Sequence, residues 1–231
     1  MPTRYTLYSE KQDIEEYLET RFLEPEQYNP SYNIAPATHM PVARVDHSGK
    51  RVITSYRWGL PEPGTDRYAS DDENGESDLI PHINKEDFED SSYLMGLLQK
   101  KRCIIPANGF YEWKKLTDNQ EPFYLRLLNK ELTAFAGLYD NIIDENGEKS
   151  HAYMILNVAA NAMVKPLSDH MPAMLGAESH DLWLNRSVED SEVLLEALQP
   201  TVIYEMATLR VPELVNDTEK DSPELIQPIP K

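Results

Sequence analysis

The chain has 231 residues and carries 22 lysines and arginines against 40 aspartates and glutamates, which gives a formal charge of −18 at pH 7. This charge excludes a generally basic coat for nucleic acid. The longest apolar runs are far shorter than the roughly 20 residues that cross a bilayer, and the opening residues lack the pattern of a secretory signal. A single cysteine excludes an internal disulfide. We therefore expect a globular, cytoplasmic protein with no membrane segment, structural metal or cofactor.

The first third of the chain reads as one surface helix followed by strands. Apolar residues recur at helical spacing among charges over residues 10–22, with Ser9 as the expected N-cap. Residues 42–45 and 51–58 flank a polar turn, as the two strands of a β-hairpin do. The stretch 61–78 has almost no apolar residue, so we expect an exposed loop there and not a boundary between domains.

Strands dominate the middle of the chain, and helices return near its end. Further strands are expected at residues 102–106, 109–113, 123–128, 132–139, 152–158 and 202–207. Helices are expected at residues 91–98, 178–184 and 188–198. Turn residues at Asn129-Lys130 predict a hairpin between the third and fourth of these strands, and Asn146-Gly147 marks another. Hairpins and separate helices without βαβ alternation predict the α+β class.

A series of short phrases runs through almost the whole chain. They are Arg4-Tyr-Thr-Leu, Tyr32-Asn-Ile-Ala-Pro, Arg57-Trp-Gly-Leu, Ile83-Asn84, the block from Arg102 to Trp113, Phe135-Ala-Gly-Leu-Tyr and Met171-Pro-Ala-Met-Leu. In this order they resemble the SRAP family (SOS response-associated peptidase), whose members recognise abasic sites in single-stranded DNA. The resemblance implies a single SRAP domain at residues 1–216, with a barrel-like, mostly antiparallel β core and peripheral helices. The acidic residues 217–231 are expected to form a tail that packs on the surface or frays.

The resemblance also implies a chemistry at the N-terminus. In the family, removal of the first Met usually leaves a cysteine, which captures the ring-opened sugar aldehyde of an abasic site as a stable thiazolidine. The family's helping Asn and Glu correspond to Asn84 and Glu112 of this chain. Glu112 stands among aromatic residues, where burial favours the protonated carboxyl and suits it to proton transfer.

Several positions near the expected site depart from the family pattern. Position 2 is Pro2, so a thiazolidine cannot form, and Glu86 reverses the charge of an arginine. Ser168 replaces the usual histidine, and His170 stands where the family often has arginine. His170 is a candidate to take over the role of the lost histidine, with a structural histidine as the alternative.

Pro2 leaves two interpretations open. After removal of Met1 its secondary amine can attack an aldehyde and form an iminium, as a lysine does in a Schiff base. The protein is then an abasic-site lyase, while the peptidase activity of the family name would have only Met1 to remove. Alternatively, the protein has lost its nucleophile and is a catalytically inactive SRAP homologue that serves as a DNA- or protein-binding module. Cys103, beside an apolar pair, is expected in the core and not as a substitute nucleophile.

The expected contacts to single-stranded DNA are cations and an aromatic platform: Arg4, Arg57, Trp58, Lys85 and Arg102. Core packing is the alternative for Trp58. Each phosphate contact works against the repulsive field of an acidic protein, so binding to strands with abasic sites is expected to be weak and strongly salt-sensitive. If DNA binding is lost, a protein partner is the alternative.

Overall fold

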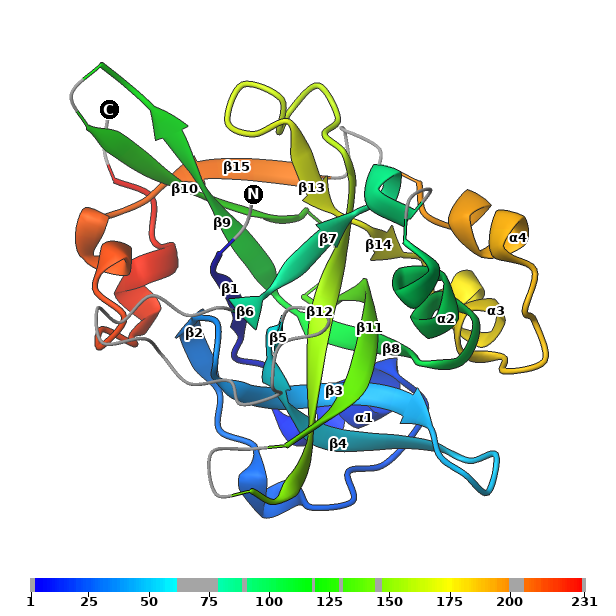
Figure 1. Cartoon of the computed structure of the whole chain (residues 1–231). Helices are drawn as coiled ribbons and strands as arrows, with labels where there is room; N and C mark the ends of the chain where they lie inside the picture. The colour runs from blue at the N-terminus through cyan, green and yellow to red at the C-terminus, as the bar shows by residue number, and fades with distance from the viewer. Residues whose placement is uncertain are drawn as a thin grey trace.

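The computed structural model describes residues 3–61, 79–88, 91–117, 119–128, 131–143, 147–199 and 206–229 (Figure 1). The expectations for Pro2, for the loop after Pro61 and for the turns at Asn129-Lys130 and Asn146 lie outside the described residues.

Five strands close into a barrel. They are β3 (His39–Val45), β4 (Arg51–Trp58), β8 (Arg102–Ala107), β11 (Thr133–Ile143) and β12 (Lys149–Ala159). They pair in the ring β12–β4–β3–β8–β11–β12, in which only the β12–β4 pairing is parallel. The pairing of β3 with β4 confirms the first expected hairpin, and the ring confirms the barrel-like, mostly antiparallel core.

A second, fully antiparallel sheet of five strands runs in the order β15 (Met206–Arg210), β10 (Gln120–Leu127), β9 (Gly109–Lys115), β1 (Tyr5–Leu7) and β2 (Ser31–Ile34). The expected hairpin between residues 123–128 and 132–139 is wrong. β10 pairs with β9 and β15, whereas β11 pairs with strands of the barrel, so the chain changes sheets between them.

Short strands complete the β structure: β5 (Leu60–Pro61), β6 (Leu79–Ile80), β7 (His82–Asn84), β13 (His170–Pro172) and β14 (Met174–Leu175). β7 lies parallel to β12, and β13 lies antiparallel to the same strand. Both short strands therefore flank the last residues of β12.

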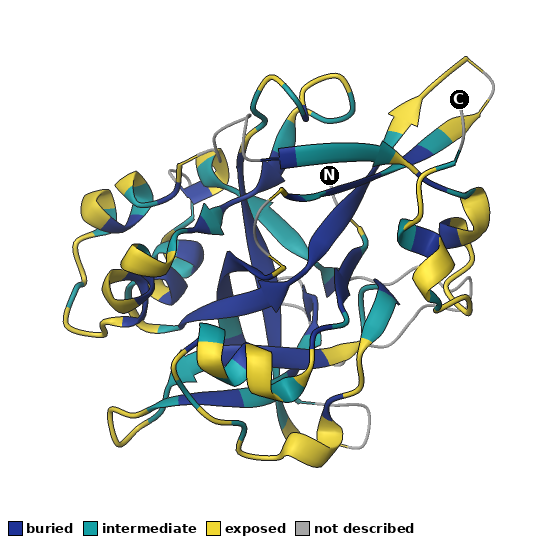
Figure 2. Ribbon diagram, turned by 180° about the vertical axis from the view of Figure 1, so that it is seen from behind, coloured by how far each residue is buried: buried dark blue, intermediate teal, exposed yellow. Residues whose placement is uncertain are grey.

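The helices are short and peripheral, and Figure 2 shows their outer faces exposed around buried strands. They are α1 (Lys11–Tyr17), α2 (Ser92–Lys100), α3 (His180–Leu184) and α4 (Ser191–Glu196), with 3₁₀ turns at Pro25–Gln27, Lys85–Phe88, Ala177–Ser179, Glu213–Asn216 and Pro223–Ile226. None of the described helices is long and apolar enough to cross a membrane.

The expected N-cap of the first helix is wrong. α1 begins after Glu10 without a side-chain cap. The Ser9 hydroxyl instead accepts a hydrogen bond of 2.7 Å from Nδ2 of Asn108, and Oδ1 of Asn108 accepts from the backbone N–H of Tyr8 and Ser9. The bend between β8 and β9 thus fixes the segment that leaves β1.

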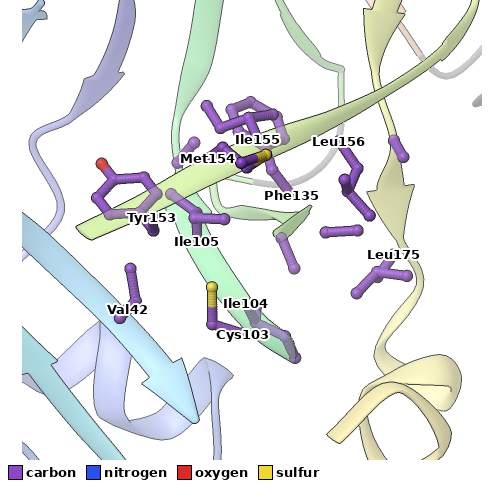
Figure 3. Packing of buried hydrophobic residues seen from close by; sticks show 14 of the residues in the cluster. Val42, Cys103, Ile104, Ile105, Phe135, Tyr153, Met154, Ile155, Leu156 and Leu175 are labelled. Carbon is purple, nitrogen blue, oxygen red and sulfur yellow. The ribbon is translucent and has the colours of Figure 1, made fainter. Parts of the chain in front are cut away.

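The core fills the barrel and continues beneath the helices. Cys103 is fully buried among Val42 and Ile105, as expected (Figure 3). A β-carbon at Gly137 would lie 2.2 Å from Cδ1 of Ile105, so this strand position accepts only glycine without movement of its neighbours. A smaller cluster joins Tyr111 and other residues of the five-stranded sheet to the C-terminal segment, where Leu225 is fully buried.

Candidate functional site

One open pocket of about 870 Å³ lies where the start of the chain, β7, β9 and the turn before β13 meet. It brings together Arg4, Asn84, Glu112 and His170, which are far apart in the sequence. The other residues of its lining are Thr3, Trp113, Lys115, Gln120, Lys165, Pro166, Leu167, Ser168, Asp169 and Asn216.

Glu112 is the buried acid of this pocket. It lies in β9 opposite Phe123 and is only 2% exposed. Burial raises the pKa of its carboxyl above the usual value, and a hydrogen bond with the Ser168 side chain opposes part of that shift. Ser168 occupies the position of the family's usual histidine, so a hydroxyl and not an imidazole hydrogen-bonds the Glu112 carboxyl.

Asn84 ends β7 and is held from two sides. Its backbone N–H donates to Oδ2 of Asp87 at 3.0 Å. Its side-chain Oδ1 accepts from Nδ2 of Asn157 at 3.5 Å, and Asn157 is fully buried opposite it in β12. Since the Oδ1 atom is engaged, Asn84 is set up to offer its Nδ2 donor. Asn157 could not be found from the sequence, because a polar residue in an apolar strand cannot be assigned a partner before the register is known.

Two departures from the family pattern meet at the edge of the pocket. Nε2 of His170 lies 3.5 Å from Oε2 of Glu86, so a protonated His170 would be paired with the charge-reversed residue. The His170 backbone N–H donates to Oγ of Ser168 at 3.4 Å. His82 is close by, and burial followed by neighbouring positive charges lowers its pKa to about 4. His170 thus lines the pocket, and its imidazole faces Glu86.

The rest of the lining includes three cations and two amide side chains. Arg4 donates to the carbonyl of Thr3 at 2.7 Å. Lys165 is paired with Asp169 at 2.7 Å, and Lys115 is exposed. Trp113 is half-buried and donates from Nε1 to Oδ1 of Asn216 at 2.7 Å, which fixes its ring at the pocket wall. A wall of this kind suits an anionic ligand that also has a flat face.

Two of the expected DNA contacts are corrected. Trp58 is fully buried, donates from Nε1 to the carbonyl of Pro81 at 2.7 Å and packs edge-on against Tyr5, so it offers no stacking face. Arg102 is 5% exposed, and its guanidinium donates to five backbone carbonyls around α2 and α3. Burial takes both side chains away from any surface where a strand could lie.

The other two expected contacts lie outside the pocket. Nζ of Lys85 donates to the carbonyl of Leu195 at 2.6 Å, at the end of α4. Arg57 is half-buried in β4 and is not among the described residues that line the pocket. In the described part of the chain, no three His, Cys, Asp or Glu side chains gather as metal ligands.

Comparison with known proteins agrees with the motifs and the fold. The family described as SOS response associated peptidase (SRAP) matches residues 1–218. The abasic site processing protein YoqW of Bacillus subtilis is 34% identical over 226 residues, which cover 97% of this chain and 98% of that protein. The abasic site processing protein HMCES of Xenopus tropicalis is 27% identical, covering 96% of this chain and 73% of its own. A crystal structure of a Bacteroides thetaiotaomicron protein has a TM-score of 0.81 at 19% identity, covering 98% of this chain and 99% of its own.

Proposed function

This chain belongs to the SRAP family, and on that premise we propose that its pocket receives an abasic site in single-stranded DNA and holds the ring-opened sugar through a reversible imine at Pro2. The observation that carries the proposal is that Thr3 lines the same pocket as the buried Glu112. Consecutive Cα atoms lie 3.8 Å apart. The amine at position 2 directly precedes Thr3, which lines the same pocket as Glu112.

In the proposed reaction Glu112 first donates a proton and later accepts one. The Pro2 nitrogen, free after removal of Met1, attacks the aldehyde carbon of the ring-opened sugar and forms a carbinolamine. The protonated carboxyl of Glu112 gives its proton to the hydroxyl, which leaves as water, and an iminium cation remains. Water can hydrolyse the iminium and restore the free amine and the aldehyde. Loss of a proton from the neighbouring carbon to the Glu112 carboxylate, with departure of the 3′ phosphate, gives slow strand cleavage.

An α-amine is better suited to this attack than the lysines of the pocket. Ordinary α-amino groups have a pKa near 8, whereas that of lysine is near 10.4. Lys165 is also held by Asp169 as an ion pair. In our proposal Lys115 and Lys165, with Arg4, attract the phosphates that flank the lesion, Asn84 orients a sugar oxygen and Trp113 stacks on a base.

The decisive experiment is trapping with borohydride. Intact mass first establishes that Met1 is removed. The protein is then mixed with a single strand that contains one abasic site, with and without borohydride. We expect a protein–DNA crosslink only with borohydride, because an iminium is hydrolysed unless it is reduced to an amine.

The controls separate the nucleophiles. An extra residue before Pro2 should abolish the crosslink, whereas Lys165→Arg should retain it. Pro2→Cys should give a crosslink that needs no reductant if the rest of the pocket is sound. If no crosslink appears under borohydride although Met1 is absent, the imine mechanism is wrong and the chain is an inactive SRAP homologue that serves as a binding module.

A further inference from the structure

A second group of functional side chains gathers at one end of the barrel. Arg44 from β3, Tyr56 from β4, Tyr139 from β11 and His151 from β12 each come from a different barrel strand. The rings of Tyr56 and His151 are stacked with centroids 4.6 Å apart, and the Tyr56 and Tyr139 centroids are 5.5 Å apart. We call this group the barrel-end cluster.

The barrel-end cluster is separate from the pocket. His151 lies six residues before Asn157 on β12, and Asn157 is the neighbour of Asn84. At roughly 3.3 Å per strand residue this separation is about 20 Å. A ligand as small as one nucleotide that is bound in the pocket therefore does not reach the barrel-end cluster.

Arg44 is the centre of the cluster. Its guanidinium carbon lies 5.7 Å from the Tyr56 ring centroid and 5.9 Å from that of Tyr139. Its guanidinium makes one long donation, of 3.4 Å, to the carbonyl of Val45. Among the described residues no carboxylate lies within ion-pair distance of it. A half-buried cation that lacks an anionic partner has lost hydration without full compensation, which favours an anion from outside.

Further cations surround the cluster. Lys100 and Arg186 are exposed and border, with Tyr139, a shallow depression beside Arg102. Arg186 donates to the carbonyl of Asp46 at 3.2 Å, and Lys101 is paired with Asp140. The nearby acids among the described residues are Asp140, already paired, Asp46, whose carboxyl accepts from Ser48, and Glu189, which lies close to Arg102. On a chain with a net charge of −18 this is a local excess of positive charge.

We propose that the barrel-end cluster binds a phosphate group carried by a nucleotide or a nucleic-acid strand. Arg44 offers its guanidinium fork to the phosphate, Lys100 and Arg186 flank it, and Tyr139 provides an aromatic face for the attached base. The combination of an arginine fork with aromatic faces is the one that recognises phosphate and base together. The site does not depend on the chemistry proposed for Pro2, because none of its residues lines the pocket.

The test measures equilibrium binding by calorimetry with three probes that contain no aldehyde. They are inorganic phosphate, deoxyadenosine monophosphate and a ten-nucleotide single strand without an abasic site. Arg44→Met should weaken binding of the mononucleotide at least tenfold, and the strand about threefold because the pocket cations still hold it. Arg44→Lys should show an intermediate loss, since an ammonium supplies charge without the fork. Binding of phosphate alone identifies a general phosphate site, and preference for the mononucleotide or strand identifies recognition of the base.

Arg21→Gln is the matched control, because it removes one exposed cation that lies elsewhere and is paired with Glu15. It should change binding of each probe less than twofold. If Arg44→Met does not fold, Arg186→Met on the exposed rim should still weaken mononucleotide binding about threefold. Equal binding by wild type, Arg44→Lys and Arg186→Met overturns the proposal, as does equally tight binding of a polyglutamate peptide.

Discussion

Glu112 combines burial with access to a large pocket. Its carboxyl is 2% exposed, and burial raises its pKa. This environment favours the protonated carboxyl more than water would. The same burial that makes Glu112 a proton donor must therefore lower the stability of the folded state when the carboxyl ionises.

We expect that cost to be visible in unfolding experiments. The folded-state pKa of Glu112 is raised, so between its ordinary value and the raised value the folded state binds more protons than the unfolded state. Stability supplied by the protonated form is therefore present at low pH and lost as pH rises through the folded pKa. Each unit of elevation corresponds to about 1.4 kcal/mol. Glu112→Gln should be more stable than wild type in urea at pH 8, with the difference disappearing near pH 4. A constant difference across this range would contradict the shift.

The same substitution should act oppositely on the reaction. If Glu112 transfers the proton in imine formation, Glu112→Gln should slow borohydride trapping about 100-fold, the usual size of a general acid–base contribution. In wild type the trapping rate should fall as pH rises through the raised pKa. Gel quantification of the crosslink over time measures both effects. A rate for Glu112→Gln within threefold of wild type would remove Glu112 from the mechanism.

The distinctive phrases of the sequence contain residues that have very different surroundings in the structure, and the roles of those that line the pocket stay predictions. Asn84 and Glu112 were found from ordered phrases, and the structure brings them to one pocket. Trp58 and Arg102 belong to equally distinctive phrases, yet both are buried. A sequence motif does not distinguish a residue that packs in the core from one that contacts a ligand.

At the scale of elements, Arg102 joins the helices to the barrel. Arg102 lies at the start of β8 and donates through Nε to the carbonyl of Trp183 at 2.5 Å and through Nη2 to that of Asn185 at 2.6 Å, both at the end of α3. Through Nη1 it donates to the carbonyl of Gln99 near the end of α2 at 2.8 Å. One guanidinium thus satisfies carbonyls that two helix ends would otherwise leave without partners.

We expect Arg102→Gln to destabilise the fold by about 3 kcal/mol, because several buried carbonyls lose a charged donor. Urea unfolding measures this loss. Arg21→Gln, in an exposed ion pair, should change stability by less than about 1 kcal/mol. Affinity for single-stranded DNA, corrected for the folded fraction, should be unchanged by Arg102→Gln. A selective loss of DNA binding with normal stability would restore the original expectation for this residue.

The elements that were predicted well are those with a strong local pattern. The polar turn between β3 and β4 and the helix that begins at Ser91 have such patterns, and the Ser91 hydroxyl caps α2 by accepting from the N–H of Leu94. The expected hairpin of β10 and β11 had turn residues and adjacent strands as well. This expected hairpin is wrong because β10 and β11 belong to different sheets. The pairing of strands that are distant in the sequence cannot be inferred from a short stretch of residues.

At the scale of the whole molecule, the charge of −18 is not spread evenly. The pocket gathers Arg4, Lys115 and Lys165. These cations attract the phosphates of a strand, whereas the rest of the acidic protein repels them. Affinity for a strand should therefore depend on ionic strength more than on contact area.

We therefore expect a steep salt dependence of single-strand binding. Three phosphate contacts predict a slope of about −2 for the logarithm of affinity against that of salt, which is about a 20-fold loss between 50 and 200 mM. Fluorescence anisotropy with a labelled strand measures the slope. Lys115→Met should make the slope shallower by about 0.7, and Arg21→Gln should leave it unchanged. A flat salt dependence would show that these cations do not meet phosphates.

The outer strand of the five-stranded sheet, β2, is covered by the end of the chain. The backbone N–H of Tyr32 donates to Oδ1 of Asp221, and Nδ2 of Asn33 donates to the carbonyls of Val215, Asp217 and Lys220. An uncovered strand edge is a template for pairing with other chains and a route to aggregation. We therefore expect that a truncation after Asn216 would remove fifteen residues, Asp221 among them, and leave this strand edge open to pairing with other chains.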